Sequence, residues 1–317
     1  MTRCLVTGGA GFIGSHIVRG LLARGDQVRV LDNLSTGHLR NLKEVSGQIE
    51  LIEGDLRDEV AVTRAVQGVE IIFHEAALAS VPRSVAFPLE SHAHCATGTL
   101  VLLDAARQAK VRRLVYAGSS SAYGNLPFSS KRESDFPTPL SPYAATKLAA
   151  EFYCQVFFRT YGLETVCLRY FNVFGPRQDP SSPYSAVIPL FIAKLLQGER
   201  PIIYGDGLQS RDFVYVKNVV DANLKAAAAP GAAGMTFNVG TGRSVSLLVI
   251  LKHLQQLLGT EILPQMEPPR VGDVRDSLAD ISQAEKVLGY LPGVDLEEGL
   301  RRTVDSYRKT LTGRLLP

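Results

Sequence analysis

The sequence predicts an α/β fold in which a doubly wound parallel sheet is joined to a smaller mixed α/β lobe. Short Val/Ile/Leu-rich runs alternate with helix-length connections through the first half of the chain, as in a parallel sheet covered on both faces. A glycine-rich turn links the first such run to an amphipathic stretch. The length of 317 residues, of which 45% are hydrophobic and 21% charged, is enough for a large core and two lobes.

Six apolar runs are the predicted strands of the sheet. They are RCLVT at 3–7, QVRVLD at 27–32, IELIEGD at 49–55, VEIIFHEA at 69–76, VRRLVYAGS at 111–119 and ETVCLRYFN at 164–172. After about Asn172, longer proline-containing loops such as GPRQDPSSPYS interrupt shorter helices. We therefore expect a sheet domain over residues 1–173, completed by about 213–240. The second lobe is then built from 174–212 and 241–317.

The glycine-rich segment LVTGGAGFIGSHIVRGLL has the order strand, turn and helix that a dinucleotide site requires. Gly8, Gly11 and Gly14 let the backbone turn tightly and approach a pyrophosphate at a helix amino terminus. Asp32 ends the next predicted strand, 18 residues after Gly14, where its carboxylate can accept both ribose hydroxyls and repel the extra phosphate of NADP. The segment therefore predicts a Rossmann domain that binds NAD.

The stretch SPYAATK places a phenol and an ammonium together. Ser141 can cap a helix whose first position is Pro142, and Tyr143 and Lys147 then share one face at spacing i, i+4. A free tyrosine has a pKa near 10, but a neighbouring ammonium and a positive nicotinamide ring both favour the phenolate. Tyr143 is therefore a candidate base. The alternative is an amphipathic surface helix that holds the pair by accident.

Composition narrows the class of partner. The net charge of +3 suits small anionic ligands but lacks the dense basic stripe of a nucleic-acid-binding protein. The chain opens directly into a predicted strand, and its apolar runs are too short to span a membrane. We expect a cytoplasmic protein that binds neither nucleic acid nor membrane.

The four cysteines are scattered without paired spacing, which is typical of buried thiols in a reducing compartment. The segment HAHC at 92–95 is the one arrangement that resembles a metal site. His92 and His94 are two residues apart, however, and would point to different faces of a helix. We therefore expect no metal.

Four motifs taken together resemble the extended short-chain dehydrogenase/reductase superfamily: TGGAGFIG, the Asp32 position, GSSSAYG and SPYAATK. RYFNVFGPRQDP and YGDGLQSRDFVYV narrow the resemblance to nucleotide-sugar epimerases and dehydratases. The resemblance covers essentially the whole chain and is greatest to the UDP-N-acetylglucosamine 4-epimerase and UDP-glucose 4-epimerase branch.

The resemblance implies three sets of site residues. The catalytic set is Tyr143, Lys147, Ser119 and Ser120, with Ser119 favoured over Ser120 as the hydroxyl partner. The cofactor-binding set is Gly8, Gly11, Phe12, Ile13, Gly14, Asp32, Asn33, Asp55, Leu56, Ala76, Ala77, Tyr143, Lys147 and Tyr170. The substrate-binding set is Ser80, Ser121, Asn172, Val187, Tyr204, Arg211, Arg270, Asp273 and Ser277. A simple loop cap is an equal alternative for Asp55, and a surface ion pair with Asp212 is the alternative for Arg211.

The dehydratases of the family carry an Asp-Glu pair just after the hydroxyl residue, where this chain has Ser120 and Ser121. Epimerisation needs no such acid. The resemblance therefore implies an NAD-dependent isomerase, a 4-epimerase of UDP-hexoses that uses a transient 4-keto sugar. A small residue, Ser277, at the position where epimerases confined to glucose and galactose carry tyrosine implies that N-acetylated sugars are also accepted. A UDP-glucuronate or UDP-N-acetylglucosaminuronate 4-epimerase is the alternative, and a non-catalytic NAD-binding regulator is the alternative of another class.

Three positions depart from the pattern of the family. Gly118 stands where relatives often have serine, Cys95 where they commonly have asparagine, and Ala79 where galactose-type epimerases carry lysine. The resemblance further implies a homodimer formed by helices near 88–109 and 142–161.

Overall fold

The computed structural model describes residues 1–126, 130–180, 186–269 and 275–312. Its largest element is a seven-stranded sheet in which every pairing is parallel. In spatial order the strands are β12 (Thr236–Val239), β7 (Glu164–Tyr170), β5 (Arg113–Ser119), β4 (Ile71–His74), β1 (Arg3–Thr7), β2 (Gln27–Asp32) and β3 (Ile49–Glu53). The order reverses at β1, as in a doubly wound dinucleotide-binding sheet. The predicted fold class is confirmed.

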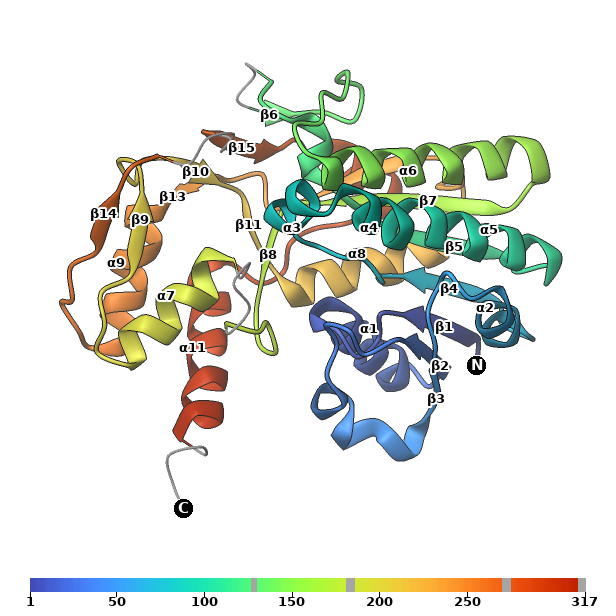
Figure 1. The fold of residues 1–317 in the computed structure, drawn as a ribbon, viewed down its shortest axis with the longest axis horizontal. Coiled ribbons are helices and arrows are strands. Elements are labelled where there is room, and N and C mark those ends of the chain that lie inside the picture. Colours follow the sequence, from blue (N-terminus) through green and yellow to red (C-terminus); the bar gives the residue numbers. More distant parts are fainter. Residues whose placement is uncertain (127–129, 181–185, 270–274, 313–317) are drawn as a thin grey trace.

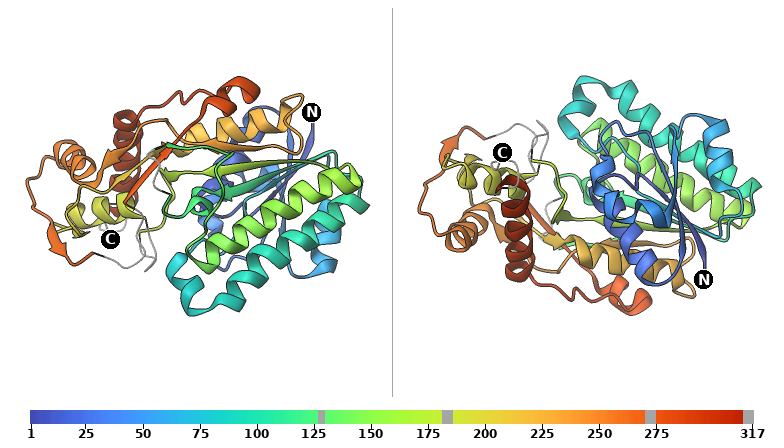
Figure 2. Two further views of the ribbon diagram at one scale, coloured as in Figure 1. Left: turned by 90° about the horizontal axis from the view of Figure 1, so that it is seen from above. Right: turned by 90° about the horizontal axis from the view of Figure 1, so that it is seen from below.

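The sheet is covered on both faces, as Figures 1 and 2 show. Leu5 and Val6 of β1 are both fully buried but belong to different hydrophobic clusters, because successive side chains of a strand point to opposite faces. One face packs against α1 (Phe12–Ala23) and α8 (Val216–Ala228). The other packs against α2 (Glu59–Val66), α5 (Gly98–Gln108) and α6 (Pro142–Tyr161).

The connection from β4 to α5 is broken into short pieces. It consists of α3 (Val81–Ala86), α4 (Pro88–His92) and a π-helical turn, Ala93–Thr97, that contains Cys95. Two 3₁₀ turns, Leu39–Asn41 and Lys43–Gln48, lie between β2 and β3, and a third, Ser120–Tyr123, follows β5.

A third hydrophobic cluster lies outside the sheet. It is formed mainly by α7 (Val187–Leu196), α9 (Leu247–Leu258) and α11 (Leu296–Thr312), which Figure 1 shows on the left beside the paired strands β9 (Ile202–Tyr204) and β14 (Gln265–Glu267). α9 begins at the Ser246 cap, whose hydroxyl accepts a hydrogen bond from the Val249 amide.

Short strands connect this region to the sheet. β8 (Asn172–Phe174) continues from β7 and pairs with β11 (Phe213–Tyr215). A four-stranded sheet has the order β13 (Val245–Ser246), β10 (Ser210–Arg211), β15 (Asp276–Ala279) and β6 (Ser130–Lys131), and α10 (Ser282–Leu288) follows β15.

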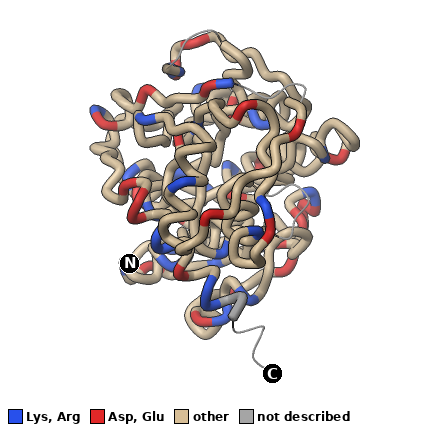
Figure 3. Tube along the Cα trace, turned by 90° about the vertical axis from the view of Figure 1, so that its left-hand side faces the viewer, with Lys and Arg blue, Asp and Glu red and all other residues tan. Residues whose placement is uncertain are grey.

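The surface charge is mixed. In Figure 3, Lys and Arg are interspersed with Asp and Glu along the described chain. No helix within the described residues combines the length and apolarity needed to cross a membrane.

Candidate functional site

A cavity of about 570 Å³ lies where the parallel strands end, on both sides of β1. This is the place where open α/β sheets bind ligands. Eleven residues of the predicted cofactor-binding set line it: Gly8, Gly11, Phe12, Ile13, Gly14, Asp32, Asn33, Asp55, Leu56, Ala76 and Ala77.

The glycine turn has the shape that a dinucleotide site needs. Gly8 has φ +67°, which disfavours any residue with a side chain. A Cβ atom on Gly14 would lie 2.2 Å from the Gly8 carbonyl oxygen, so the turn and α1 approach too closely for alanine. Gly11 precedes α1 without a side-chain cap, which leaves the first helical amides available to an anion. These residues fit the pyrophosphate of NAD.

Asp32 is buried at the end of β2, beside this turn. Its carboxylate accepts hydrogen bonds from the amides of Ala10, at 2.9 Å, and Leu34, at 2.8 Å. Burial raises the pKa of Asp32, and these two amides oppose that increase. The carboxylate therefore supports the glycine turn and also faces the cavity.

Replacing Asp32 by alanine is expected to relax the preference for NAD over NADP, because the change removes a ribose acceptor and a charge that repels the additional phosphate. Asp32→Asn should do the same, but its single side-chain oxygen can accept from only one of the Ala10 and Leu34 amides, which bond different oxygens of Asp32. The measurement is the ratio of dissociation constants for the two cofactors. Unchanged discrimination in both variants would show that another residue selects the cofactor.

The next strand contributes a second acidic residue. Asp55, which follows β3, accepts hydrogen bonds from Asn33 Nδ2 at 2.8 Å and from Arg57 Nε at 2.8 Å. The Arg57 hydrogen bond holds the pKa of Asp55 well below its usual range. The α2 cap is instead Asp58, which accepts from the amides of Val60 and Ala61. Asp55 Oδ1 also accepts from the Arg57 amide at 2.9 Å, so Asp55 caps its own loop, which was the alternative to a cofactor role, and leaves the following helix to Asp58.

The segment after β8 forms one wall of the cavity, which Gln178 and Asp179 line. Asp179 accepts from His38 Nε2 at 3.0 Å and lies 3.4 Å from Arg40 Nη2, so it joins this wall to the loop after β2. The motif GPRQDP contributes to the family resemblance, but the sequence does not predict that Gln178 and Asp179 line the cavity.

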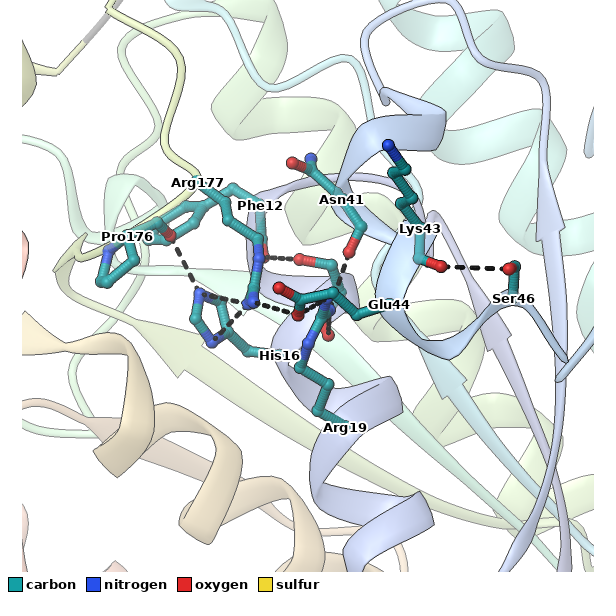
Figure 4. A network of polar contacts seen from close by, with 10 residues as sticks. Phe12, His16, Arg19, Asn41, Lys43, Glu44, Ser46, Pro176 and Arg177 are labelled. Carbon is teal, nitrogen blue, oxygen red and sulfur yellow. Dashed lines mark hydrogen bonds and ion pairs between the residues drawn. The ribbon is translucent and has the colours of Figure 1, made fainter. Parts of the chain in front are cut away.

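Figure 4 shows how the same segment is attached to α1. His16 Nε2 lies 2.9 Å from the Pro176 carbonyl oxygen, and Arg177 approaches the His16 ring from a left-handed backbone conformation with φ +68°. Burial lowers the pKa of His16 to about 4, so the ring is neutral at pH 7. Arg19 donates to the Asn41 carbonyl at 2.7 Å and thereby secures the next loop.

The predicted catalytic residues meet near the ends of β4, β5 and β7. Ser141 caps α6 as expected, accepting from the Ala144 amide at 3.2 Å. The half-buried Tyr143 and the buried Lys147 lie on the first turns of α6. Burial raises the pKa of Tyr143, whereas the nearby Ser119 hydroxyl lowers it. The structure therefore brings Ser119 and Tyr143 together.

Ser119 ends β5 and organises the turn behind it. Its hydroxyl accepts from the Ser121 amide at 3.2 Å and lies 2.8 Å from the Ser121 hydroxyl. Ser120 begins the 3₁₀ turn. Among the three serines, the geometry favours Ser119 as the partner of Tyr143.

Lys147 contacts the ring of Tyr116, which the sequence did not suggest as its neighbour. Its Nζ lies 4.6 Å from the centroid of the Tyr116 ring, a cation–π distance. Burial lowers the pKa of Lys147, and the negative charge of Glu75 opposes that shift.

Glu75 is another ionisable residue of the cavity that the sequence did not predict. It directly follows β4 and lines the cavity, and its Oε1 accepts a hydrogen bond from the Tyr170 hydroxyl at 2.8 Å. Burial raises the pKa of Glu75 to about 7. The sequence feature that could have pointed to Glu75 is a charged residue directly after the apolar run IIFH.

A second cavity, of about 350 Å³, lies in the lobe of α7 and α9. Four residues of the predicted substrate-binding set line it: Asn172, Val187, Tyr204 and Arg211. Ala186 lines both cavities, so the two adjoin. Arg211 donates to the carbonyls of Ser210 and Arg275, each at 2.9 Å.

The remaining predicted substrate residues are distributed differently. Ser80 lines the larger cavity and caps α3 by accepting from the Arg83 amide. Ser277 is half-buried on β15, paired with Arg211 across the strands. Arg270 and Asp273 lie outside the described residues.

The three departures from the family pattern have local explanations of unequal strength. A Cβ on Gly118 would lie 3.1 Å from the Leu168 carbonyl oxygen of the neighbouring strand, so a serine there would be crowded. Cys95 is buried in the π-helical turn. Ala79 lines the larger cavity, and nothing in the structure explains why it is not lysine. Among the described residues, no three His, Cys, Asp or Glu side chains gather as a metal site.

Known proteins resemble this chain over nearly its whole length. A UDP-glucose 4-epimerase of Mycolicibacterium smegmatis is 41% identical over 310 residues, which is 96% of this chain and 98% of the relative. The solved structure of a UDP-N-acetylglucosamine 4-epimerase from Methanobrevibacter ruminantium, in complex with UDP-N-acetylmuramic acid, is 41% identical with a TM-score of 0.93 and covers 98% of this chain and 99% of its own.

A Thermus thermophilus UDP-glucose 4-epimerase, solved with NAD, is 40% identical with a TM-score of 0.90 and covers 96% of this chain and 99% of its own. The model of the NAD dependent epimerase/dehydratase family matches residues 4–240. These findings confirm the predicted superfamily and cofactor. The chain belongs to the NAD-dependent epimerase/dehydratase family.

Proposed function

We propose that this chain is an NAD-dependent 4-epimerase of UDP-hexoses that works through a transient 4-keto sugar. One observation carries the proposal: Ser119 at the end of β5 lies beside Tyr143 of α6, and Lys147, one turn later on α6, interacts with the charge of Glu75 in the cofactor cavity. A second cavity adjoins the first. The relatives named as UDP-glucose and UDP-N-acetylglucosamine 4-epimerases support the same reaction. Interconversion of UDP-sugars by the purified protein tests it.

The chemistry divides between cofactor and side chains. When bound, NAD accepts a hydride from carbon 4 of the sugar and returns it to the opposite face. Tyr143 removes the proton of the 4-hydroxyl and gives it back after the keto sugar has turned over. Ser119, whose hydroxyl is near enough to Tyr143 to lower its pKa, orients that proton. Because burial raises the pKa of Tyr143, the positive charges of Lys147 and of the nicotinamide are needed to favour the phenolate.

The adjoining cavity holds the UDP group in this proposal. Arg211 and Asn172 meet the diphosphate, since a guanidinium offers several donors to phosphate oxygens, and Tyr204 stacks on the uracil. Both 174–212 and 241–317 contribute to the lobe around this cavity. We therefore assign UDP-sugar binding to this lobe and NAD binding to residues 1–173 with about 213–240.

We further propose that N-acetylated UDP-sugars are substrates, because the small Ser277 leaves room for an acetamido group. In the structure, Asp280 and not Ser277 bonds the amide and the hydroxyl of Ser282 at the start of α10. The alternative, that Ser277 caps the helix region that follows it, has no support in these contacts.

Ser277→Tyr is expected to lower kcat/KM for acetylated UDP-sugars by about five- to 150-fold, the kinetic equivalent of about 1–3 kcal/mol of overpacking, while turnover of UDP-glucose is largely kept. Ser46→Tyr, at an exposed position, is the control for adding a tyrosine. Equal losses for both sugar classes, or no activity of the parent protein on acetylated sugars, would contradict the specificity assignment.

We also propose a homodimer built on α4 and α6. Exposed apolar and aromatic side chains project from these helices: Leu89, Phe152, Tyr153, Val156 and Tyr161. Such a surface suits a second copy of this chain, because monomers seldom expose large contiguous apolar patches. Sedimentation should show a dimer at micromolar concentration, and a monomer would remove this claim.

A further inference from the structure

The carboxyl group of Glu75 has no role in the mechanism described so far, yet it occupies a well-defined place. It directly follows β4, on the side of β1 away from Asp32 and toward β5 and β7. Asp32 is the predicted ribose ligand beside the glycine turn, on the β2 side of β1. Glu75 lies on the β4 side, toward the other end of the same cavity. The reacting end of the cofactor belongs there, beside Tyr143 and Lys147.

Hydrogen bonds from β1, β7 and α8 hold Glu75 and its carboxyl group in place. The Glu75 amide donates to the Thr7 carbonyl of β1 at 3.2 Å. From β7, the Tyr170 hydroxyl donates to Oε1 at 2.8 Å, and that hydroxyl accepts in turn from Asn223 Nδ2 of α8 at 2.7 Å. A half-buried acceptor with a dedicated two-step donor chain is held in one position.

The charged and titratable neighbours of Glu75 are few. From α6, the positive charge of Lys147 lowers the pKa of Glu75, and Glu75 in turn raises the pKa values of Lys147 and Tyr143. His74, the last residue of β4, lies between the hydroxyls of Thr7 and Thr99. Burial lowers the pKa of His74 to about 3, so its ring stays neutral.

We propose that Glu75 supplies a negative charge at the nicotinamide end of the cavity and thereby favours the oxidised cofactor over the reduced one. When the bond between carbon 4 and its hydrogen breaks, both electrons leave with the hydride and one positive charge disappears from the cavity. An ionised carboxylate opposes that loss and favours return of the hydride to the keto sugar. The proposal rests on the proposed function only in placing the nicotinamide beside Lys147 and Tyr143.

The effect must depend on pH in a definite direction. Burial raises the pKa of Glu75 to about 7, and a positive ring beside it would lower that value again, whereas a neutral ring would not. Relative affinity for NAD over NADH should therefore rise with pH across neutrality. Because Tyr143 titration would add to the same trend, the measurement belongs in a Tyr143→Phe background.

The experiment equilibrates the full-length Tyr143→Phe protein with an equal mixture of NAD and NADH and measures the bound ratio. At about pH 8, Glu75→Gln is expected to shift that ratio toward NADH on the order of tenfold, with little change at about pH 6. Glu70→Gln is the matched control, because Glu70 is exposed at the opposite end of β4 and bonds the Arg3 amide. It should leave the ratio unchanged.

An unchanged ratio in Glu75→Gln at both pH values would overturn the proposal. If that variant does not fold, Tyr170→Phe provides a second test: it keeps the charge but removes a donor to the carboxylate, so the pH midpoint of the ratio should move upward. No movement would also overturn the proposal. Neither readout involves a sugar, so failure of the epimerase assignment would leave both interpretable.

Discussion

Tyr143→Phe is expected to lower turnover of a UDP-hexose about a hundredfold or more, the usual scale for loss of a general base, while UDP-sugar and NAD binding persist. The phenyl ring can occupy the same half-buried place on α6, so only the hydroxyl that meets Ser119 is lost. The measurements are steady-state turnover and the dissociation constants for both ligands.

Tyr153→Phe is the matched control: Tyr153 lies on the same helix with its side chain exposed in the single chain, and phenylalanine keeps the ring that the proposed dimer surface uses. Its turnover should equal that of the parent protein. Near-native turnover in Tyr143→Phe would show that the base is elsewhere. A parallel loss of NAD binding would show instead that the phenol holds the cofactor.

Arg169→Met is expected to reduce the free energy of unfolding by about 3–5 kcal/mol, the range for removing one partner of a buried ion pair. Arg169 and Glu151 are both buried, and they share two hydrogen bonds, of 3.0 Å from Nε and 2.7 Å from Nη2. The guanidinium also lies 4.7 Å from the centroid of the Tyr123 ring, at the end of the serine turn. Loss of the arginine leaves the Glu151 carboxylate unpaired in the core.

Chemical denaturation measures the effect, and two further variants identify its cause. The double variant Glu151→Met/Arg169→Met should recover most of the loss, since no buried charge is left without a partner. Arg301→Met breaks an exposed pair with Glu298 and should change stability very little. An Arg169→Met protein as stable as its parent would mean that the buried pair contributes nothing beyond packing.

Six of the seven strands of the sheet were predictable because each carries its own signal, whereas β12 was not among the predicted runs. The runs at 3–7 and 27–32 match β1 and β2 in full, and the glycine turn between them can adopt few conformations. The run predicted at 164–172 is divided by Phe171 into β7 and β8.

The four-stranded sheet was not predicted. β6 and β10 are two residues long, too short for any periodicity, and are joined by β15 from far along the chain. Their pairing is set by tertiary structure alone.

The candidate site likewise contains residues that a local sequence pattern predicts and residues that depend on long-range contacts. Motif spacing predicted roles for Gly8, Asp32, Tyr143 and Lys147, because each lies within a local element whose geometry the sequence specifies. Glu75 was missed because its significance depends on Tyr170, a contact between residues 95 positions apart. Long-range polar contacts of this kind have no local pattern to reveal them.

The most direct test of the central claim is incubation of the purified protein with NAD and, separately, UDP-glucose, UDP-N-acetylglucosamine and UDP-glucuronate, with the sugar products resolved by NMR. We predict interconversion with the 4-epimer for UDP-glucose and UDP-N-acetylglucosamine, without net consumption of NAD. Turnover of UDP-glucuronate alone would transfer the assignment to a uronate epimerase. Bound NAD with no interconversion of any UDP-sugar would contradict the account and favour a non-catalytic NAD-binding protein.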